Sequence, residues 1–364
     1  MPKNPICFLL SGGGTGGHIF PALSIADELK RRYPDAIIHF VGASDRMEME
    51  KIPAAGYSIT GLWISGIHRS DGWKNLSFPL KLMSSLIKSV RILTKYKPTV
   101  VIGTGGFASG ALLYAAHWLG HKTLIQEQNS YPGITNKWLA AKVNSVCVAF
   151  DGLESFFPPS KIHLTGNPIR KELIGLLPLR SKALQTFGLT DKPTLLVLGG
   201  SLGARNVNLA VKNLYSSILD SGCNIIWQTG KLYINDLKKE VPQREGLFMD
   251  AFIQDMSLAY AAADLVLSRA GAGTLSELAV VGKATILVPS PNVAEDHQTK
   301  NAQALVQRGA AILIEEKNLK SDLEKQLLDL LKNESKRNEL SAAISEIARP
   351  KATEAIVDEI ERWM

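Results

Sequence analysis

Residues 6–18 read ICFLLSGGGTGGH, and this stretch decides the fold. It opens with an apolar run, residues 6–10, of the length of one buried strand. Five glycines follow within residues 12–17, and the next segment places apolar side chains at helical spacing: Ala22, Ile25, Ala26 and Leu29. A strand, a glycine-rich turn and a helix in this order predict the start of a doubly wound α/β domain, whose turn lets a ligand approach the backbone.

The same alternation continues along the chain. Short apolar runs alternate with segments of helical period, which predicts parallel sheets covered by helices. The expected strands are 6–10, 37–41, 100–102, 123–125 and 146–148, and then 194–198, 225–227, 265–267, 285–288 and 311–314. Two such series in 364 residues predict two doubly wound domains.

Turn residues separate the two series. Gly166-Asn167-Pro168 interrupts the alternation, and the strand pattern starts again after it. We therefore expect a first domain over residues 1–165 and a second over residues 166–350. Residues 351–364 are expected to form a C-terminal helix, for which the sequence leaves the packing partner open, the first domain included.

The excess of positive charge is confined to the first half of the chain. The formal net charge is +7, from 41 Lys and Arg against 34 Asp and Glu. Residues 1–165 hold 17 of these cations and 10 of these acids, so they carry the whole excess. We therefore expect the first domain to meet an anionic partner.

The longest acid-free stretch, residues 72–126, offers one such surface. It holds seven cations: Lys74, Lys81, Lys88, Arg91, Lys95, Lys97 and Lys122. The helix expected there also has an apolar face: Leu82, Met83, Leu86, Ile87, Val90 and Leu93. One interpretation is an interfacial segment on an anionic membrane surface, and the other is a crossover helix with an ordinary solvated basic face. Nucleic acid is not expected as a partner, because the chain has no helix-turn-helix or RNP pattern.

Several other classes of site and segment are disfavoured. The longest uncharged stretch, residues 98–120, contains five glycines, so we expect no membrane-spanning helix. The three cysteines are too scattered for a disulfide framework or a zinc site. The adjacent residues Glu295, Asp296 and His297 cannot easily face one ion. We therefore expect no metal and no cofactor.

The first glycine-rich turn matches the pattern G-x-G-x-x-G, which is typical of phosphate or dinucleotide binding. A dinucleotide site also needs an acid at the end of the second strand, where residues 40–43 read FVGA. A nicotinamide cofactor is therefore disfavoured, and a tight packing turn is the alternative to a phosphate site. His18 follows at the expected helix start, where it is either a general base or a histidine that only caps and packs.

Two turns of the second half have the same design. Residues 199–204 read GGSLGA and residues 268–277 read SRAGAGTLSE, each after an expected strand and before a helix. Helix N-termini of this kind suit a phosphate, and Ser201 adds a hydroxyl. Glu277 lies about one turn into its helix, where it either holds a ribose diol or only complements the helix dipole. Two anion sites in one domain favour a nucleoside diphosphate.

Further motifs accompany these turns in both halves. In chain order they are GGTGGH at 13–18 with FPA at 20–22, GTGGF at 103–107, QEQN at 126–129, TNK at 135–137, GNPIR at 166–170, GGS at 199–201 and SRAGAGTLSE at 268–277. Together they resemble the MurG family, the bacterial N-acetylglucosaminyltransferases that complete lipid II for cell-wall peptidoglycan. The match runs in order from residue 11 to about residue 303.

This resemblance implies a GT-B glycosyltransferase fold, in which two Rossmann-like parallel-sheet domains face each other across a cleft. It implies an inverting transfer of N-acetylglucosamine from UDP-N-acetylglucosamine to the 4-hydroxyl of N-acetylmuramoyl-pentapeptide-diphosphoundecaprenol (lipid I), which forms lipid II. The first domain would bind the acceptor and the membrane, and the second would bind the donor. The family's enzymes are peripheral proteins on the cytoplasmic face of the cell inner membrane, which would account for the basic stretch.

The resemblance also implies roles for residues of the first domain. His18 is the candidate base on the acceptor hydroxyl, with Glu127 as the other candidate. Asn129 contacts the donor sugar. Three residues of the first turn lie near the transferred sugar and the acceptor diphosphate: Thr15, Gly16 and Gly17.

For the second domain, the resemblance implies the donor contacts. Arg170 contacts the donor near the hinge, Ser201 contacts the diphosphate, and the main chain of Ile253 binds uracil. Glu277 holds the ribose, and Gln298 holds sugar hydroxyls. Backbone amides for the diphosphate come from Ala272, Gly273, Thr274, Leu275 and Ser276. Such amides can offset the charge of the leaving UDP without a metal.

Three alternatives stay open at the level of sequence. The first is a GT-B enzyme with a different lipid or aglycone acceptor. The second is a nicotinamide-dependent oxidoreductase, which depends on the first glycine-rich turn alone. The third is a binding protein of the same fold without catalytic activity.

Overall fold

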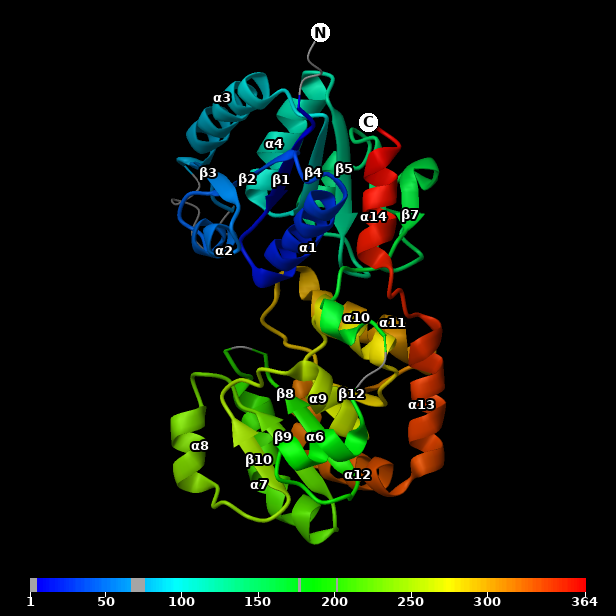
Figure 1. Ribbon diagram of the computed structural model, residues 1–364. Coiled ribbons are helices and arrows are strands. Elements are labelled where there is room, and N and C mark those ends of the chain that lie inside the picture. The colour runs from blue at the N-terminus through cyan, green and yellow to red at the C-terminus, as the bar shows by residue number, and fades with distance from the viewer. Residues whose placement is uncertain (1–4, 67–75, 176–177, 201) are drawn as a thin grey trace. The chain divides into compact units, whose positions relative to one another are not determined.

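The computed structural model describes residues 5–66, 76–175, 178–200 and 202–364 (Figure 1). The chain divides into two compact units. The first unit comprises Met1–Ile169 and Lys351–Met364, and the second comprises Arg170–Pro350. The first unit is therefore assembled from both ends of the chain, and the second is one continuous insertion between them.

A parallel sheet, of seven strands over the described residues, forms the centre of the first unit. Its strands are β1 (Cys7–Gly12), β2 (Ile37–Ala43), β3 (Ser58–Leu62), β4 (Val100–Gly105), β5 (Lys122–Glu127), β6 (Ser145–Val148) and β7 (Ile162–Leu164). The order across the sheet is β3-β2-β1-β4-β5-β6-β7. The order reverses between β1 and β4, and open α/β sheets bind their ligands at the carboxyl ends of strands at such a point.

Helices cover both faces of this sheet. They are α1 (Gly16–Arg32), α2 (Glu48–Ala54), α3 (Phe78–Tyr96), α4 (Phe107–Trp118), α5 (Ile134–Leu139) and α14 (Ala352–Glu361), with a 3₁₀ turn η2 (Pro159–Lys161). On β1, Phe8 and Leu10 pack into the core shared with α1 and α14, whereas Leu9 packs into the core shared with α3 and α4. Because both faces are covered, the inner strands are unbroken apolar runs, which is the pattern found in the sequence.

The second unit repeats this design with a parallel sheet that has six strands in the described part of the chain. They are β8 (Thr194–Leu198), β9 (Asn224–Gln228), β10 (Leu247–Asp250), β11 (Leu265–Ser268), β12 (Thr285–Leu287) and β13 (Ile312–Leu313). The order is β10-β9-β8-β11-β12-β13, so it reverses between β8 and β11. The two glycine-rich turns of this unit directly follow these two strands.

The helices of the second unit lie between its strands and at its end. They are α6 (Arg180–Thr186), α7 (Arg205–Asp220), α8 (Ile234–Glu240), α9 (Met256–Ala262), α10 (Ala272–Val281), α11 (His297–Val306), α12 (Leu319–Lys332) and α13 (Glu334–Glu346), with 3₁₀ turns η3 (Lys171–Leu173), η4 (Ala294–Asp296) and η5 (Glu316–Asn318). Trp227 on β9 is fully buried, and its indole N–H donates to Oδ1 of Asn208 on α7 at 3.0 Å. This bond satisfies the one polar group of the largest side chain in the core.

Three strands were not predicted from the sequence: β3, β7 and β10. All three are edge strands of their sheets. No residue of β7 is buried, and β3 and β10 have one buried residue each. An edge strand is covered on fewer sides, so it lacks the unbroken apolar run by which the inner strands were found.

The expected apolar face of α3 was too wide. Leu82, Leu86 and Val90 pack against the core, but Met83 and Ile87 are 60% and 48% exposed. The fully buried stripe of this helix includes the small residues Ser85 and Ser89. Helical spacing alone does not show which edge of an apolar face meets the core. None of the helices in the described ranges is long and apolar enough to cross a membrane.

Candidate functional site

The predicted base His18 lies in the first turn of α1, directly after the carboxyl end of β1. Its Nδ1 is 2.9 Å from the carbonyl oxygen of Gly13. A carbonyl oxygen only accepts, so Nδ1 carries the proton in this contact and Nε2 holds the lone pair. No described residue forms a hydrogen bond with Nε2, and the imidazole is half-buried. Nε2 is therefore free to take a proton from a substrate hydroxyl.

Glycines hold the ends of β1 and β4 close together around this imidazole. The Gly13 N–H donates to the Gly105 carbonyl at 3.3 Å. A Cβ on Gly106 would lie 2.7 Å from the Gly13 oxygen, and one on Gly105 would lie 2.9 Å from Nε2 of His18. Both glycines also have positive φ, +116° for Gly105 and +93° for Gly106. Larger residues would displace either the loop or the imidazole.

Two helix N-termini at this edge of the sheet suit an anion. Both α1 and α4 begin directly after glycine-rich turns, and neither has a side-chain cap or an acid in its first turn. The predicted residues Thr15, Gly16 and Gly17 are the N-cap and the first two residues of α1. Their unpaired N–H groups and the helix dipole favour a negatively charged ligand such as a diphosphate.

Glu127, the other predicted base, is anchored by four hydrogen bonds. It is 1% exposed at the end of β5. Its Oε1 accepts from the N–H and Nδ2 of Asn129 at 3.0 and 3.1 Å. Its Oε2 accepts from the Gly133 N–H at 3.1 Å and from Nδ2 of Asn136 at 2.8 Å. These donors occupy the lone pairs of both oxygens, so the geometry favours an anchor for the Asn129 loop over an accessible base.

An acid does lie beside the first glycine-rich turn, but it binds the turn itself. Glu48, the first residue of α2, is 1% exposed, and its Oε2 accepts from the Gly14 N–H at 2.9 Å. In a dinucleotide site this turn faces the pyrophosphate and the acid faces the ribose. The geometry therefore disfavours the nicotinamide interpretation. Sequence analysis missed Glu48 because it considered only the end of the second strand.

In the second unit, the turns after β8 and β11 line one pocket of about 450 Å³. Its lining comes from both turns, the start of α7, the segment between β12 and α11, α11 itself and η5: Gly199, Gly203, Ala204, Arg205, Asn206, Arg269, Ser290, Asn292, Gln298 and Glu316. The pocket therefore lies where the strand order reverses, which is the position expected for a nucleotide. The predicted contact Ser201 lies outside the described residues.

The N-terminus of α10 opens directly after β11. Its N-cap is Gly271, and its first turn holds no acid. The Leu275 N–H donates to the Gly271 carbonyl at 3.0 Å, and the Ser276 hydroxyl donates to the Ala272 carbonyl at 3.1 Å. The amides without a partner inside the helix are therefore the first three of the predicted run: Ala272, Gly273 and Thr274. Leu275 and Ser276 do not belong to that set, because their N–H groups form helical bonds.

Glu277 lies one turn further along α10 and is held at both oxygens. The buried Tyr260 hydroxyl donates to Oε2 at 3.2 Å, and Nε of Arg170 lies 3.2 Å from Oε1. Burial raises the pKa of Glu277, and the Arg170 guanidinium opposes that rise. Burial and the neighbouring Glu277 also raise the pKa of Tyr260 well above its usual value. Tyr260 thus stays a hydrogen-bond donor to the carboxylate, a role that sequence analysis missed.

Two predicted contacts already have one bond within the protein. The amide oxygen of Gln298 accepts from the Ser290 N–H at 2.9 Å, which leaves its nitrogen to a ligand. The N–H of Ile253, which is 3% exposed, donates to Oε1 of Gln228 at 3.0 Å. Only the carbonyl of Ile253 therefore remains to bind a base through its main chain.

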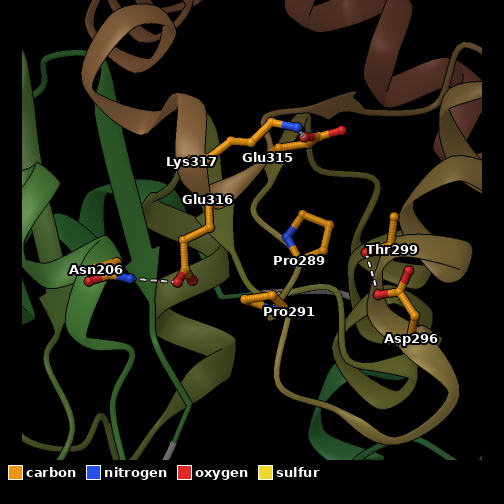
Figure 2. Close-up of a pocket in the computed structure, with 8 residues that line it drawn as sticks. All are labelled: Asn206, Pro289, Pro291, Asp296, Thr299, Glu315, Glu316 and Lys317. Carbon is orange, nitrogen blue, oxygen red and sulfur yellow. Dashed lines mark hydrogen bonds and ion pairs between the residues drawn. The ribbon is translucent and has the colours of Figure 1, made fainter.

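Arg269 joins three segments of this unit, and sequence analysis gave it no role. Its Nη1 donates to the carbonyls of Val288 and Pro289 at 3.1 and 3.0 Å, and its Nη2 forms an ion pair with Glu316. Glu316 also accepts from Nδ2 of Asn206 at 2.5 Å (Figure 2). Asn206 and Glu316 also line a second pocket of about 610 Å³, which adjoins the first. These contacts of Arg269 form only when the fold brings the segments together, so the sequence alone does not show them.

Comparison with known proteins covers both units. Residues 8–148 match the glycosyltransferase family 28 N-terminal domain, and residues 194–356 match the corresponding C-terminal domain. A protein of Flavobacterium psychrophilum is 54% identical over 97% of this chain and 96% of its own length. A protein of Christiangramia forsetii is 52% identical over 99% of this chain and 98% of its own. Both are named UDP-N-acetylglucosamine--N-acetylmuramyl-(pentapeptide) pyrophosphoryl-undecaprenol N-acetylglucosamine transferase.

A solved structure agrees with these relatives. The crystal structure of MurG from Acinetobacter baumannii matches 98% of this chain and 100% of its own, with a TM-score of 0.80 and 29% sequence identity. The predicted GT-B class, with two Rossmann-like parallel-sheet units, is confirmed by this match and by the strand orders of both sheets. On this sequence identity and structural match, the chain belongs to the MurG family of glycosyltransferases.

Proposed function

We propose that this protein is an inverting transferase that moves N-acetylglucosamine from UDP-N-acetylglucosamine to the 4-hydroxyl of lipid I and so forms lipid II. The observation that carries the proposal is an identity of 50 to 54%, over at least 97% of the chain, to relatives that share this transferase name. The sites of the two units support it. One unit offers Nε2 of His18 beside two helix N-termini without side-chain caps, and the other offers a pocket suited to a nucleoside diphosphate.

On the donor side, the second unit binds UDP and stabilises it as the leaving group. The amides of Ala272, Gly273 and Thr274 face the diphosphate, and Glu277 accepts the hydroxyls of the ribose. Gln298 donates its amide to the transferred sugar. Negative charge builds up on the diphosphate as the bond to the sugar breaks, and preorganised N–H groups offset that charge at the moment it forms.

On the acceptor side, His18 takes the proton. Its Nε2 removes the proton of the acceptor 4-hydroxyl while the hydroxyl oxygen bonds to C1 of N-acetylglucosamine. The C1–oxygen bond to the diphosphate breaks, and its electron pair leaves with UDP. Attack from the face opposite the leaving group inverts C1. The open starts of α1 and α4, with Thr15, Gly16 and Gly17, bind the acceptor diphosphate.

The surface of α3 is the proposed membrane contact. Leu80, Met83 and Ile87 are 68%, 60% and 48% exposed. They line a groove of about 780 Å³ together with Lys88, Arg91 and Lys95. Exposed apolar side chains beside cations are the pattern of an interfacial helix on anionic lipid. We therefore infer a peripheral protein on the cytoplasmic face of the inner membrane.

The first experiment measures transfer of radiolabelled N-acetylglucosamine from its UDP donor to a short-chain lipid I analogue, with EDTA present. We expect labelled product from the wild type and a loss of about 10²- to 10⁴-fold for His18→Ala, because a positioned general base contributes about that much. His117→Ala, at an exposed position on α4, is the matched control and should transfer as the wild type does.

Each outcome decides a different part of the proposal. Transfer that survives in His18→Ala would assign the proton to another group. Transfer that stops with EDTA and returns with a divalent cation would contradict stabilisation of UDP by amides alone. No transfer to the lipid I analogue, while UDP still raises the thermal stability, would point to a GT-B enzyme with another acceptor.

A further inference from the structure

We infer that Glu48 is a positioning residue for His18 and acts on it through a single peptide group. Oε2 of Glu48 accepts from the Gly14 N–H at 2.9 Å. Nδ1 of His18 donates to the Gly13 carbonyl, also at 2.9 Å. The N–H of Gly14 and the carbonyl of Gly13 belong to the same peptide bond. The carboxylate, the peptide group and the imidazole therefore form one continuous chain of hydrogen bonds. The inference rests on the proposed function in one respect, the role of His18 as the base.

The geometry of a peptide bond makes this chain directional. The N–H and C=O of a trans peptide point in opposite directions, so Glu48 and His18 hold it from opposite sides. The carboxylate polarises the N–H, which makes the carbonyl a stronger acceptor for Nδ1–H, since hydrogen bonds in series strengthen one another. The proton is thereby kept on Nδ1 and the lone pair on Nε2. The same charge stabilises the imidazolium that forms once Nε2 has taken a proton.

The carboxylate itself is fixed by the backbone. Its Oε1 accepts from the Ala43 N–H at 3.0 Å, at the end of β2. A Cβ on Gly13 would lie 2.1 Å from Oε1, and one on Gly42 would lie 2.6 Å from Cγ of Glu48. Two glycines thus make room for one buried side chain, and the carboxylate cannot turn away without losing both N–H partners.

Glu48 has no ion-pair partner within the described part of the chain. Throughout the described residues, no Lys, Arg or His lies within ion-pair distance of this carboxylate. Arg46 and Lys51, the nearest cations in sequence, pair with Asp45 and Glu50. The charged and titratable groups on α1 and β2, which pack against α2, have partners of their own: Asp27, Glu28, Lys30, Arg31, Arg32 and His39. The segments next to the imidazole, residues 12–17 and 104–106, hold no titratable side chain.

A spectroscopic test needs no activity. In protein with ¹⁵N-labelled histidine, long-range ¹H–¹⁵N spectra report which imidazole nitrogen carries the proton, and His18→Ala assigns the signal. We expect His18 to hold its proton on Nδ1 in the wild type. In Glu48→Gln we expect a mixture of tautomers at the same pH, because the amide has lost the charge and accepts at only one of the two N–H groups. Glu50→Gln, at an exposed position of the same helix, should leave the spectrum unchanged.

Kinetics give the second readout. We expect Glu48→Gln to lower kcat/KM by about 10- to 100-fold, the usual effect of losing a residue that orients a functional histidine. The acidic limb of the kcat/KM profile should move to lower pH, because the imidazolium loses a stabilising negative charge. UDP binding, which belongs to the second unit, should be unchanged. Unchanged protection of β1 to β6 from hydrogen exchange shows that the first unit of the variant, which contains Glu48, is folded.

The double variant Glu48→Gln, His18→Ala shows whether Glu48 positions His18 or only supports the glycine-rich turn. If Glu48 acts through His18, Glu48→Gln should have no further effect on transfer in the His18→Ala background. An equal loss in both backgrounds, or a wild-type tautomer in Glu48→Gln, would overturn the inference. If the wild type fails to transfer at all, the proposed function fails, and the tautomer spectra still decide the role of Glu48.

Discussion

Two opposing effects set the pKa of the Glu277 carboxyl. Burial raises the pKa of this carboxyl, and the Arg170 guanidinium, whose Nε lies 3.2 Å from Oε1, opposes the rise. The ionised form accepts at both oxygens and forms the stronger, charge-assisted hydrogen bonds to the hydroxyls of a ribose, whereas protonation turns one oxygen into a donor. UDP affinity should therefore be complete above the pKa of Glu277 and should fall as the pH drops through it.

Removal of the cation should shift that fall. In Arg170→Met the pKa of Glu277 should rise further, so the loss of UDP affinity should begin at a higher pH than in the wild type. Calorimetric titration with UDP at a series of pH values, from neutral to acidic, measures the midpoint pH at which UDP affinity is lost. Arg244→Met is the control, because Arg244 pairs with Asp220 and not with Glu277. An unchanged midpoint in Arg170→Met would mean that the guanidinium does not act on this carboxylate.

Sequence analysis found the residues that follow a glycine-rich turn directly and missed those that reach it from elsewhere. His18 and Glu277 lie within one or two turns of a helix start, so the local pattern pointed to them. Glu48 and Tyr260 belong to other segments, and Arg269 lies in a turn but binds Val288, Pro289 and Glu316 of other segments. Tertiary structure alone brings these three residues to their partners. The roles predicted for His18 and Glu277 stay predictions until the transfer and binding experiments are done.

Helix α3 combines exposed apolar side chains with cations. Single substitutions can test whether this helix binds a membrane. Arg91→Gln should weaken binding to vesicles that contain anionic lipid by about fivefold, since one cation near such a surface contributes about 1 kcal/mol. Ile87→Gln should weaken binding to anionic and neutral vesicles alike, because it removes apolar contact without changing the charge. Co-sedimentation with vesicles measures both.

A substitution that removes a cation from the second unit shows whether a change in net charge alone weakens vesicle binding. Lys336→Gln removes one cation from α13 in the second unit, where Lys336 pairs with Glu339. It should bind vesicles as the wild type does. If all three variants bind equally, α3 is an ordinary solvated crossover helix, which is the other interpretation that the sequence left open.

A strand could be predicted from the sequence when both of its faces are buried by helices. The ten expected strands are all present, and nine of them are inner strands, which are buried on both faces in a parallel sheet. The tenth, β13, is an edge strand that the sequence shows as an apolar run. The edge strands β3, β7 and β10 carry residues such as Thr60, His163 and Asp250, which a run of apolar letters cannot reveal. The same limit applies to α3, where the sequence gave the apolar residues but not which of them meet the core.

In the whole molecule, α14 completes a core formed by residues from the other end of the chain. Ile356, Val357 and Ile360 are fully buried with residues of β1 and α1. Each such side chain contributes about 1.5–3 kcal/mol, so the three together approach the total stability of a typical domain, about 5–15 kcal/mol. Truncation after Pro350 should therefore unfold the first unit and leave the second folded.

Hydrogen exchange measured by mass spectrometry distinguishes the two units. In the truncated chain, peptides from residues 7–148 should exchange rapidly, and peptides from β8 to β12 should stay protected. The variant Arg362→Ala, at an exposed position beyond α14, is the control. In this variant the amides of both units should stay protected from exchange. Protection of the first unit in the truncated chain would mean that its core is stable without the helix.

The organisation of the whole molecule was readable from repetition and turn chemistry. Two series of alternating strands and helices predicted two sheets, and the turn at residues 166–168 lies just before the point, between Ile169 and Arg170, where the compact units divide. The sequence left the packing of residues 351–364 open, because an amphipathic helix shows which of its faces is apolar and not what covers that face.

The discontinuity of the first unit also sets an order of events during synthesis. A ribosome adds roughly 5–20 residues per second, so roughly 10–40 s pass between the emergence of Ile169 and that of Lys351. Throughout this interval the nascent N-terminal half lacks α14, which covers one face of its sheet together with α1. The second unit can fold during translation, whereas the first unit must wait until α14 has been synthesised. The part of the chain that is made first is therefore the part that completes its fold last.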